Sequence, residues 1–242
     1  MDVYAINDLE KLLRENRYVG RGIIVGTTPD AKHAAFAYFI MGRSQNSRNR
    51  IFVEKDGAVF TRPFDASKVE DPSLIIYAAV RKARGKTVVT NGDQTDTVCD
   101  GIGQGKTLAE SLKTRTFEPD APNFTPRISA VLDFTGGKFS YEMSILKSID
   151  RTGSACCRYT FEYPSAPGTG HFLHTYQGDG NPLPSFFGEP ERVAMKDDID
   201  EFADMLWRSL DRDNKISLYV RYIAIKDGTE QSRLINKNIG EN

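Results

Sequence analysis

The stretch AYFIMGRSQNSRNRIFV, residues 37–53, sets two apolar runs on either side of a polar segment. This is the pattern of strand, loop and strand. The segment contains three arginines, Arg43, Arg48 and Arg50, and no acid follows them before Glu54. Guanidinium groups carry forked donors that match anionic oxygens, so the pattern predicts an anion-binding loop at two strand ends. The alternative is a solvated basic loop between two strands.

Composition narrows the class of protein. The chain has 242 residues, 39% of them apolar, and a net charge of −1, so a sizeable core can form and the chain as a whole is not suited to binding nucleic acid. No apolar stretch approaches the ~20 residues that span a bilayer, and the N-terminal segment lacks an apolar signal core. We therefore expect one cytoplasmic domain over residues 1–242, with neither nucleic acid nor a membrane as partner.

Cysteine and histidine spacing argues against a metal site. Cys99, Cys156 and Cys157 are odd in number and form no Cys-x-x-Cys pair, so neither a disulfide framework nor a zinc site is expected. His171 and His174 would share a face only in a helix, and the surrounding pattern predicts a strand. No metal and no cofactor are predicted.

Arg21 lies between Gly20 and Gly22 in the predicted strand YVGRGIIVG, residues 18–26. Glycines on both sides remove side chains that would crowd a ligand, so we expect Arg21 to reach one. The alternative is a solvent-facing arginine at a bend. A second arginine, Arg127, begins the predicted strand of FTPRISAVLD, residues 124–133.

Further polar residues gather at other predicted strand ends. The segment KTVVTNGDQTD, residues 86–96, is a short strand followed by a turn at Asn91 and Gly92. The turn does not require the polar residues after it, which include Thr95 and Asp96. We interpret GIGQGK, residues 101–106, as a flexible connector into a helix that a Thr107 and Glu110 capping box begins.

Two more residues are candidates for a functional site. Tyr77 lies in the apolar segment at residues 72–82, where a tyrosine is usually core, with its hydroxyl bound to a neighbour. Glu118 precedes a proline-rich irregular loop that ends at Arg127.

The element order predicts an α+β fold. About ten strands in hairpins, with helices near residues 6–17 and 196–210 and no alternation of single strands and helices, favour antiparallel sheets covered by helices. Asn7 and Asp8 can cap the first helix, Asp56 and Gly57 form a hairpin turn, and residues 139–145 alternate between apolar and polar as a strand does. The long loop at residues 176–190 has too many Gly and Pro residues for regular structure.

Four blocks together resemble the archaeal-type IMP cyclohydrolase family. They are YVGRGIIVG at 18–26, AYFIMGRSQNSRNR at 37–50, VVTNGDQTD at 88–96 and FTPRISAVLD at 124–133. The segment GDGNPLPSF at 178–186 is similar to longer bacterial members. The resemblance implies a four-layer αββα sandwich like that of N-terminal-nucleophile hydrolases. It also implies closure of 5-formamidoimidazole-4-carboxamide ribonucleotide (FAICAR) to IMP and water, without metal or cofactor.

The resemblance also suggests roles. Tyr77 and Glu118 would transfer protons, Asn91 would orient the carboxamide, and Arg21 would complete the catalytic set. The expected substrate-binding residues are Arg43, Ser44, Asn49, Arg50, Gly92, Thr95, Asp96 and Arg127. The expected partner is a small purine nucleotide, and the sequence is compatible with a homo-oligomer.

Two other functions remain open from the residues. The same arginines could serve a nucleotide sensor or carrier without catalysis. An amidohydrolase on this fold would need an internal nucleophile such as Cys156 or Ser44. Met1 and Asp2 do not provide the terminal Cys, Ser or Thr that a terminal-amine mechanism requires, so that mechanism is not expected.

Overall fold

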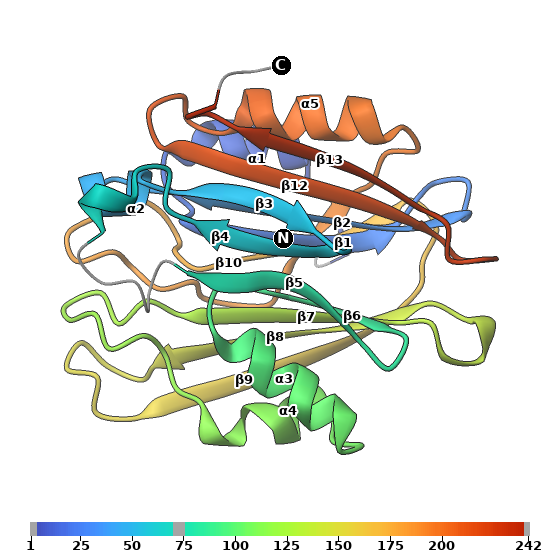
Figure 1. Ribbon diagram of the computed structural model, residues 1–242, viewed down its shortest axis with the longest axis horizontal. Coiled ribbons are helices and arrows are strands. Elements are labelled where there is room, and N and C mark those ends of the chain that lie inside the picture. The colour runs from blue at the N-terminus through green and yellow to red at the C-terminus, as the bar shows by residue number, and fades with distance from the viewer. Residues whose placement is uncertain (1–3, 70–75, 240–242) are drawn as a thin grey trace.

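The computed structural model describes residues 4–69 and 76–239, in which two large antiparallel sheets pack face to face (Figure 1). Met1, Asp2 and residues 72–75 of the predicted apolar segment lie outside the described residues. The predicted α+β class is confirmed.

The first sheet has six strands in the order β11-β10-β1-β2-β12-β13. All its ladders are antiparallel. The strands are β1 (Arg21–Thr27), β2 (His33–Met41), β10 (Thr169–His174), β11 (Glu191–Ala194), β12 (Lys215–Ala224) and β13 (Glu230–Asn236).

The second sheet has seven strands in sequence order from β3 to β9, again with antiparallel ladders. Each strand pairs with the next one along the chain, although residues 91–126 separate β6 from β7. They are β3 (Ile51–Lys55), β4 (Ala58–Arg62), β5 (Tyr77–Ala83), β6 (Lys86–Thr90), β7 (Arg127–Asp133), β8 (Ser140–Ser148) and β9 (Cys156–Pro164).

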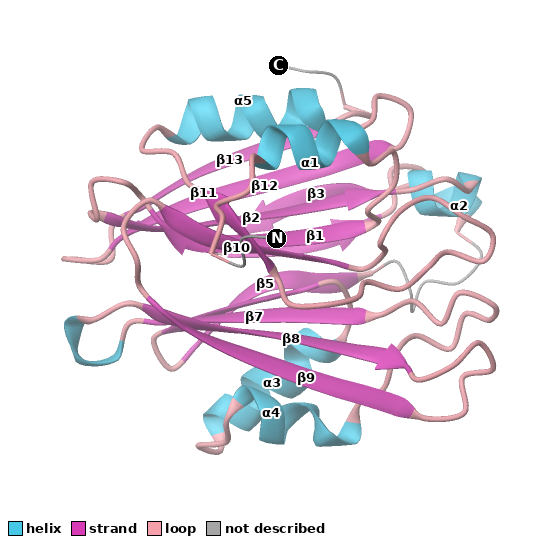
Figure 2. Ribbon diagram, turned by 180° about the vertical axis from the view of Figure 1, so that it is seen from behind, coloured by secondary structure: helices cyan, strands magenta, loops and turns pink. Residues whose placement is uncertain are grey.

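Helices cover the outer face of each sheet (Figures 1 and 2). Helices α1 (Leu9–Glu15) and α5 (Ile199–Ser209) pack on the first sheet, and α3 (Gln94–Gly103) and α4 (Leu108–Ser111) pack on the second. The apolar residues accordingly form three clusters, one under each helical layer and one between the sheets. The layers therefore run helix, sheet, sheet, helix.

Strand β2 shows why its sequence is apolar throughout. Side chains alternate between the two faces of a strand. Phe36 and Tyr38 enter the cluster between the sheets, whereas Ala37 and Phe39 enter the cluster under α1 and α5. Because both faces are buried, the run carries no polar alternation.

Several predicted elements are confirmed. Asp8 caps α1, and the Asp56–Gly57 turn joins β3 to β4 with positive φ at both residues. The capping box of Thr107 and Glu110 begins α4, as predicted, although that helix is short and continues as a 3-10 turn, η3 (Leu112–Thr114).

Other predictions were wrong in detail. The described residues contain thirteen strands rather than about ten. The arginine loop includes a short helix, α2 (Gln45–Arg48), because Ser44 caps it. The predicted connector at residues 101–106 begins inside α3, since residues 94–103 are helical despite two glycines. Strand β11 was missed because it follows the Gly- and Pro-rich loop and has only four residues.

The remaining 3-10 turns, η1 (Ala66–Lys68) and η4 (Thr135–Gly137), lie in connections. Among the helices of the described part of the chain, none combines the length and the apolar content needed to cross a bilayer.

Candidate functional site

The candidate site is built from strand ends of both sheets, at the end of the sandwich where α2 lies (Figure 1). Arg21 begins β1, Tyr77 begins β5 and Arg127 begins β7, and antiparallel pairing brings these ends together with the ends of β2 and β6. Strand ends carry loops instead of continued ladders, so they can present side chains to a ligand.

A cavity of about 320 Å³ opens at this end. It is bounded by the segment before β1, the α2 loop, the irregular loop before β7 and the segment after β10. Its lining residues are Tyr18, Arg21, Arg43, Ser44, Asn46, Ser47, Arg50, Glu118, Asp120, Asn123, Thr125, Tyr176 and Leu183.

Arg21 and Arg50 are buried cations without partners. Their side chains lie in the cavity wall, and the residues are only 7% and 6% exposed. Neither guanidinium makes a hydrogen bond or ion pair with any described residue, and the Nε of each is buried and unbonded. A buried, unpaired charge is costly in a folded protein. The two guanidiniums are therefore suited to an anionic group that is supplied from outside.

The pKa values show that these cations lie close to one another and to a carboxylate. Burial lowers the pKa of Arg50, and the positive charge of Arg21 lowers it further. For Arg21, burial also acts to lower the pKa, but Glu118 and then three tyrosines outweigh it and raise the pKa above its usual value. Both arginines remain cations, because an arginine does not deprotonate at physiological pH.

Glu118 is a buried carboxylate that is available to a ligand. It is 5% exposed, and its carboxylate makes no hydrogen bond or ion pair with any of the described residues. Burial raises the pKa of Glu118, and the cations Arg21 and Arg127 oppose that rise. A carboxylate with a raised pKa is better matched to proton transfer near neutral pH than an exposed one.

Arg127 is held beside Glu118 by paired side chains. Its Nη1 donates to Gln94 Oε1 at 2.8 Å and lies 2.7 Å from Asp93 Oδ1. A Cβ added at Gly92 would come within 2.5 Å of that Nη1 and within 3.6 Å of Glu118 Oε1. Gly92 therefore gives Arg127 room next to the carboxylate.

Tyr77 is joined across the sandwich to Tyr38. The two hydroxyls lie 2.8 Å apart, one from each sheet. Tyr77 does not line the 320 Å³ cavity, but it is close enough to Arg21 and Arg50 to affect the pKa of both. The structure thus brings together Arg21, Arg50, Tyr77, Glu118, Gly92 and Arg127.

Arg43 and Ser44 lie at the cavity mouth. Arg43 is about one-third exposed, pairs with Asp179, and places its guanidinium 5.0 Å from the ring centre of Tyr18. Ser44 Oγ accepts from the backbone N–H of Ser47 as the cap of α2. Both residues can reach a ligand, but both also have structural partners.

Asn91 has a structural role where we expected it to orient substrate. Its amide donates to the Pro126 carbonyl, and its Oδ1 accepts from the backbone of Ile128 and from Gln94. These bonds join the ends of β6 and β7, so Asn91 positions Gln94 and, through it, Arg127.

Three expected binding residues do not line the 320 Å³ cavity. Asn49 exchanges hydrogen bonds with the backbone of Asp65, and Thr95 bonds the carbonyls of Ala78 and Gly92. Asp96 pairs with Arg81 at 2.5 Å. Their polar groups serve the fold, and the sequence could not distinguish these local bonds from ligand contacts.

The glycines that flank Arg21 make room for the protein itself. A Cβ at Gly20 would come within 2.2 Å of Thr175 Oγ1, and a Cβ at Gly22 would come within 2.3 Å of the Phe39 ring. The expectation that they admit a ligand to the backbone is therefore replaced by a packing explanation.

The two nucleophiles considered from the sequence are a partly buried thiol and a hydroxyl that caps α2. Cys156 packs against the apolar residues between the second sheet and the helices α3 and α4, and burial raises the pKa of its thiol. Ser44 is at the cavity, but none of the three histidines of the chain lines it. Within the described residues, no group of three metal-ligand side chains is arranged to hold an ion.

Aromatic and polar residues of the wall were not predicted. Tyr18 and Tyr176 stack with ring centres 5.9 Å apart, and the Tyr176 hydroxyl lies 2.5 Å from Thr125 Oγ1. Thr125 also bonds Asp120. Tyr18 is the first residue of the YVGRGIIVG block, and this was a usable signal, whereas Tyr176 comes from a loop distant in sequence.

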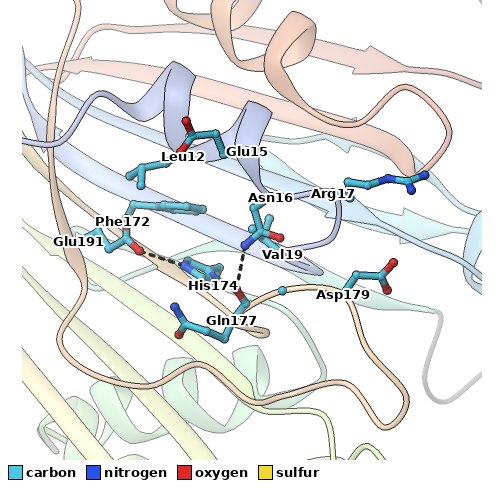
Figure 3. Close-up of a pocket in the computed structure, with 11 residues that line it drawn as sticks. Leu12, Glu15, Asn16, Arg17, Val19, Phe172, His174, Gln177, Asp179 and Glu191 are labelled. Carbon is cyan, nitrogen blue, oxygen red and sulfur yellow. Dashed lines mark hydrogen bonds and ion pairs between the residues drawn. The ribbon is translucent and has the colours of Figure 1, made fainter.

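A second cavity, of about 430 Å³, is lined in part by the sequence neighbours of Tyr18 and Tyr176, namely Arg17, Val19 and Gln177 (Figure 3). Asn16 donates to the Gln177 carbonyl, and His174 faces Glu191 at 3.7 Å. None of the residues predicted for the site lines this cavity. The candidate site is therefore the 320 Å³ cavity.

Comparison with known proteins identifies the family of this chain. The model of the IMP cyclohydrolase-like protein family matches residues 18–228, which include the cluster. An IMP cyclohydrolase of Methanopyrus kandleri is 32% identical over 181 residues, covering 70% of this chain and 89% of that protein. IMP cyclohydrolases of Methanothrix thermoacetophila and Methanocaldococcus jannaschii are 34% and 33% identical, each over 48% of this chain and 57% of the relative. The chain belongs to the IMP cyclohydrolase-like family.

Proposed function

We propose that this protein is an IMP cyclohydrolase that closes FAICAR to IMP with loss of water. The observation that carries the proposal is the group of Arg21, Arg50 and Glu118, which are buried in one cavity wall without partners among the described residues. An anionic nucleotide would supply the missing charge. The family and its named relatives supply the reaction.

Positioning accounts for much of the catalysis. The formyl carbon and the carboxamide nitrogen belong to one molecule, so the enzyme needs to hold them at attack distance, which can contribute several kcal/mol. Arg21 and Arg50 bind the negative charge of the nucleotide, and Arg43 and Ser44 contact it at the cavity mouth. Arg127 completes the pocket beside Glu118.

Ring closure requires two proton transfers. The carboxamide nitrogen attacks the formyl carbon, an N–C bond forms, and the nitrogen loses one proton to the Glu118 carboxylate. The formyl oxygen becomes a hydroxyl by taking a proton from the Tyr77 phenol. The product of this step is a cyclic carbinolamine.

Loss of water restores both residues. Protonated Glu118 returns its proton to the departing hydroxyl, the C–O bond breaks, and water leaves. The former formamido nitrogen gives its proton to the Tyr77 phenolate as the C=N bond forms. Both side chains end in their starting protonation states, so the cycle consumes no other reagent.

The architecture supports a place beside the N-terminal-nucleophile hydrolases, because two antiparallel sheets are stacked between outer helices. The chain passes from the first sheet to the second and back, which supports one IMP cyclohydrolase-like domain over residues 1–242. We place the enzyme in the cytoplasm, where its nucleotide substrate would be made.

The test is turnover. Purified protein is incubated with FAICAR, and IMP is followed by absorbance and by chromatography, with Glu118→Gln as the inactive control. IMP formation that depends on Glu118 supports the proposal. A ligand-dependent rise in melting temperature without IMP would instead indicate a nucleotide sensor and contradict the proposed activity.

A further inference from the structure

Tyr38 is a buried phenol behind the proposed proton donor. It lies on β2, is fully buried, and packs its ring 5.3 Å from that of Phe52. Its hydroxyl lies 2.8 Å from the hydroxyl of Tyr77, and no other hydrogen bond joins it to a described residue. Tyr77 is the shallower of the two, at 6% exposed.

The depth of the pair decides which phenol donates. If Tyr77 donated to Tyr38, the Tyr38 proton would point into the apolar core, where it has no acceptor. A buried donor without an acceptor costs free energy. If Tyr38 donates, its proton is satisfied and the Tyr77 proton is free to turn outward.

We propose that Tyr38 is a positioning residue, which donates to the Tyr77 oxygen and thereby directs the Tyr77 proton towards the substrate. The inference rests on the proposed function. In the reaction above, Tyr77 becomes a phenolate for part of the cycle, and the hydrogen bond from Tyr38 stabilises that anion. Tyr38 keeps its own proton throughout, because burial raises the pKa of its phenol well above the usual value.

The surrounding charges fit this role. Both tyrosines lie near the cations Arg21 and Arg50, whose charges act to lower the pKa of Tyr38 against the effect of burial. A positive field stabilises a phenolate on Tyr77 while it exists. The tyrosine pair thus joins the two sheets and also prepares one hydroxyl for chemistry.

The experiment is a double-mutant cycle with purified full-length chain and FAICAR. Tyr38→Phe is expected to lower kcat about tenfold with little change in KM, since one hydrogen bond to the reacting group is lost. Tyr77→Phe should lower kcat more. In the Tyr77→Phe background, Tyr38→Phe should have no further effect, because it acts only through Tyr77.

A matched control separates positioning from packing. Tyr219 is the cross-strand neighbour of Tyr38 on β12, is equally buried, and bonds Glu54 and Arg221 instead. Tyr219→Phe should lower the melting temperature and leave kcat unchanged. The double variant Tyr38→Phe/Tyr77→Phe leaves no unpaired hydroxyl, so it should fold even if Tyr38→Phe does not.

The outcomes are distinct. Equal loss of kcat from Tyr38→Phe in both backgrounds, or no loss in either, would overturn the positioning role while wild-type turnover upholds the function. If Tyr38→Phe does not fold, a Tyr77→Phe chain with more activity than the double variant would also overturn it. Wild-type protein that forms no IMP would overturn the proposed function itself.

Discussion

Arg21 and Arg221 are both buried arginines of the first sheet, yet their surroundings are opposite. Arg221, on β12, is 1% exposed and lies 2.9 Å from Glu54 and 3.5 Å from Glu230. It also donates to the Tyr219 hydroxyl and the Gly57 carbonyl. Arg21, at the start of β1, is almost as deep, but its guanidinium has neither a hydrogen bond nor an ion pair among the described residues.

The difference teaches how burial and function are related. The charge of Arg221 is neutralised by the protein and joins the β3–β4 hairpin to β12 and β13. The guanidinium of Arg21 has no such bonds among the described residues, and the nearby charge of Glu118 acts on it across the cavity wall. Burial alone therefore does not identify a site, whereas buried charges that face one cavity without direct partners make it a candidate.

Glu118→Gln should give the largest change in activity. The amide keeps the shape of the side chain but cannot accept the carboxamide proton, so kcat should fall by about 10²–10⁴-fold. Steady-state kinetics with FAICAR measures this. Because the carboxylate has no partner to lose among the described residues, the melting temperature should not fall; a large fall would show that Glu118 is structural.

Arg21→Met and Arg221→Met should have opposite effects. Arg21→Met should lower kcat/KM about 10³-fold through loss of a charged donor to the substrate, without loss of stability. Arg221→Met should destabilise the fold by about 1–3 kcal/mol, because it removes the hydrogen bonds that Arg221 donates to Glu54, Tyr219 and Gly57, and should spare kcat. Steady-state kinetics measures kcat/KM, and urea unfolding measures the free energy of unfolding. If both variants lost the same activity and the same stability, the contrast between Arg21 and Arg221 would be wrong.

Arg43→Ala should raise KM about tenfold and leave kcat nearly unchanged. Arg43 lies at the mouth, partly exposed, so it contributes to binding more than to the reacting atoms. Initial rates over a range of FAICAR concentrations test this. Asp179→Asn is the control, since it breaks the same ion pair but keeps the arginine. If Asp179→Asn raised KM as much as Arg43→Ala, the intact ion pair, and not the arginine alone, would be needed to bind the substrate.

Activity should fall as pH decreases through the pKa of Glu118, because the base must be ionised. Burial places that pKa above the usual value of about 4.5, and Arg127 holds it down. Arg127→Met should therefore move the acid limb of kcat to higher pH. Arg115→Met is the control, since Arg115 pairs with Asp93 as Arg127 does but is not among the main causes of the Glu118 pKa shift. An equal shift of the acid limb of kcat in both variants would contradict the assignment of that limb to Glu118.

Asp96→Asn should have the smallest effect. Asp96 pairs with Arg81 at an exposed position on α3, so its loss should change kcat, KM and stability very little. FAICAR turnover and a thermal melt measure these effects. A clear loss of activity would show that Asp96 has a role in substrate binding after all.

Local sequence predicted several elements because their signals are local. The caps of α1 and α4, the Asp56–Gly57 turn and the alternation of β8 depend on residues a few positions apart. The helical character of α3 was missed because glycines weakened the pattern. The pairing of Tyr38 with Tyr77 could not be predicted, since it joins different sheets.

The sequence by itself determined the antiparallel α+β class, the family resemblance, and the choice of Arg21, Glu118 and Arg127 as site residues to test. Only the tertiary structure decided which polar groups are already bonded within the protein, as Asn91 and Asn49 are, and which have no partner among the described residues, as is true of the Arg21 and Glu118 side chains. The physical reason is that a hydrogen bond or ion pair is a property of two groups in space. Its second partner is often distant in the chain, so residue type and spacing cannot reveal it.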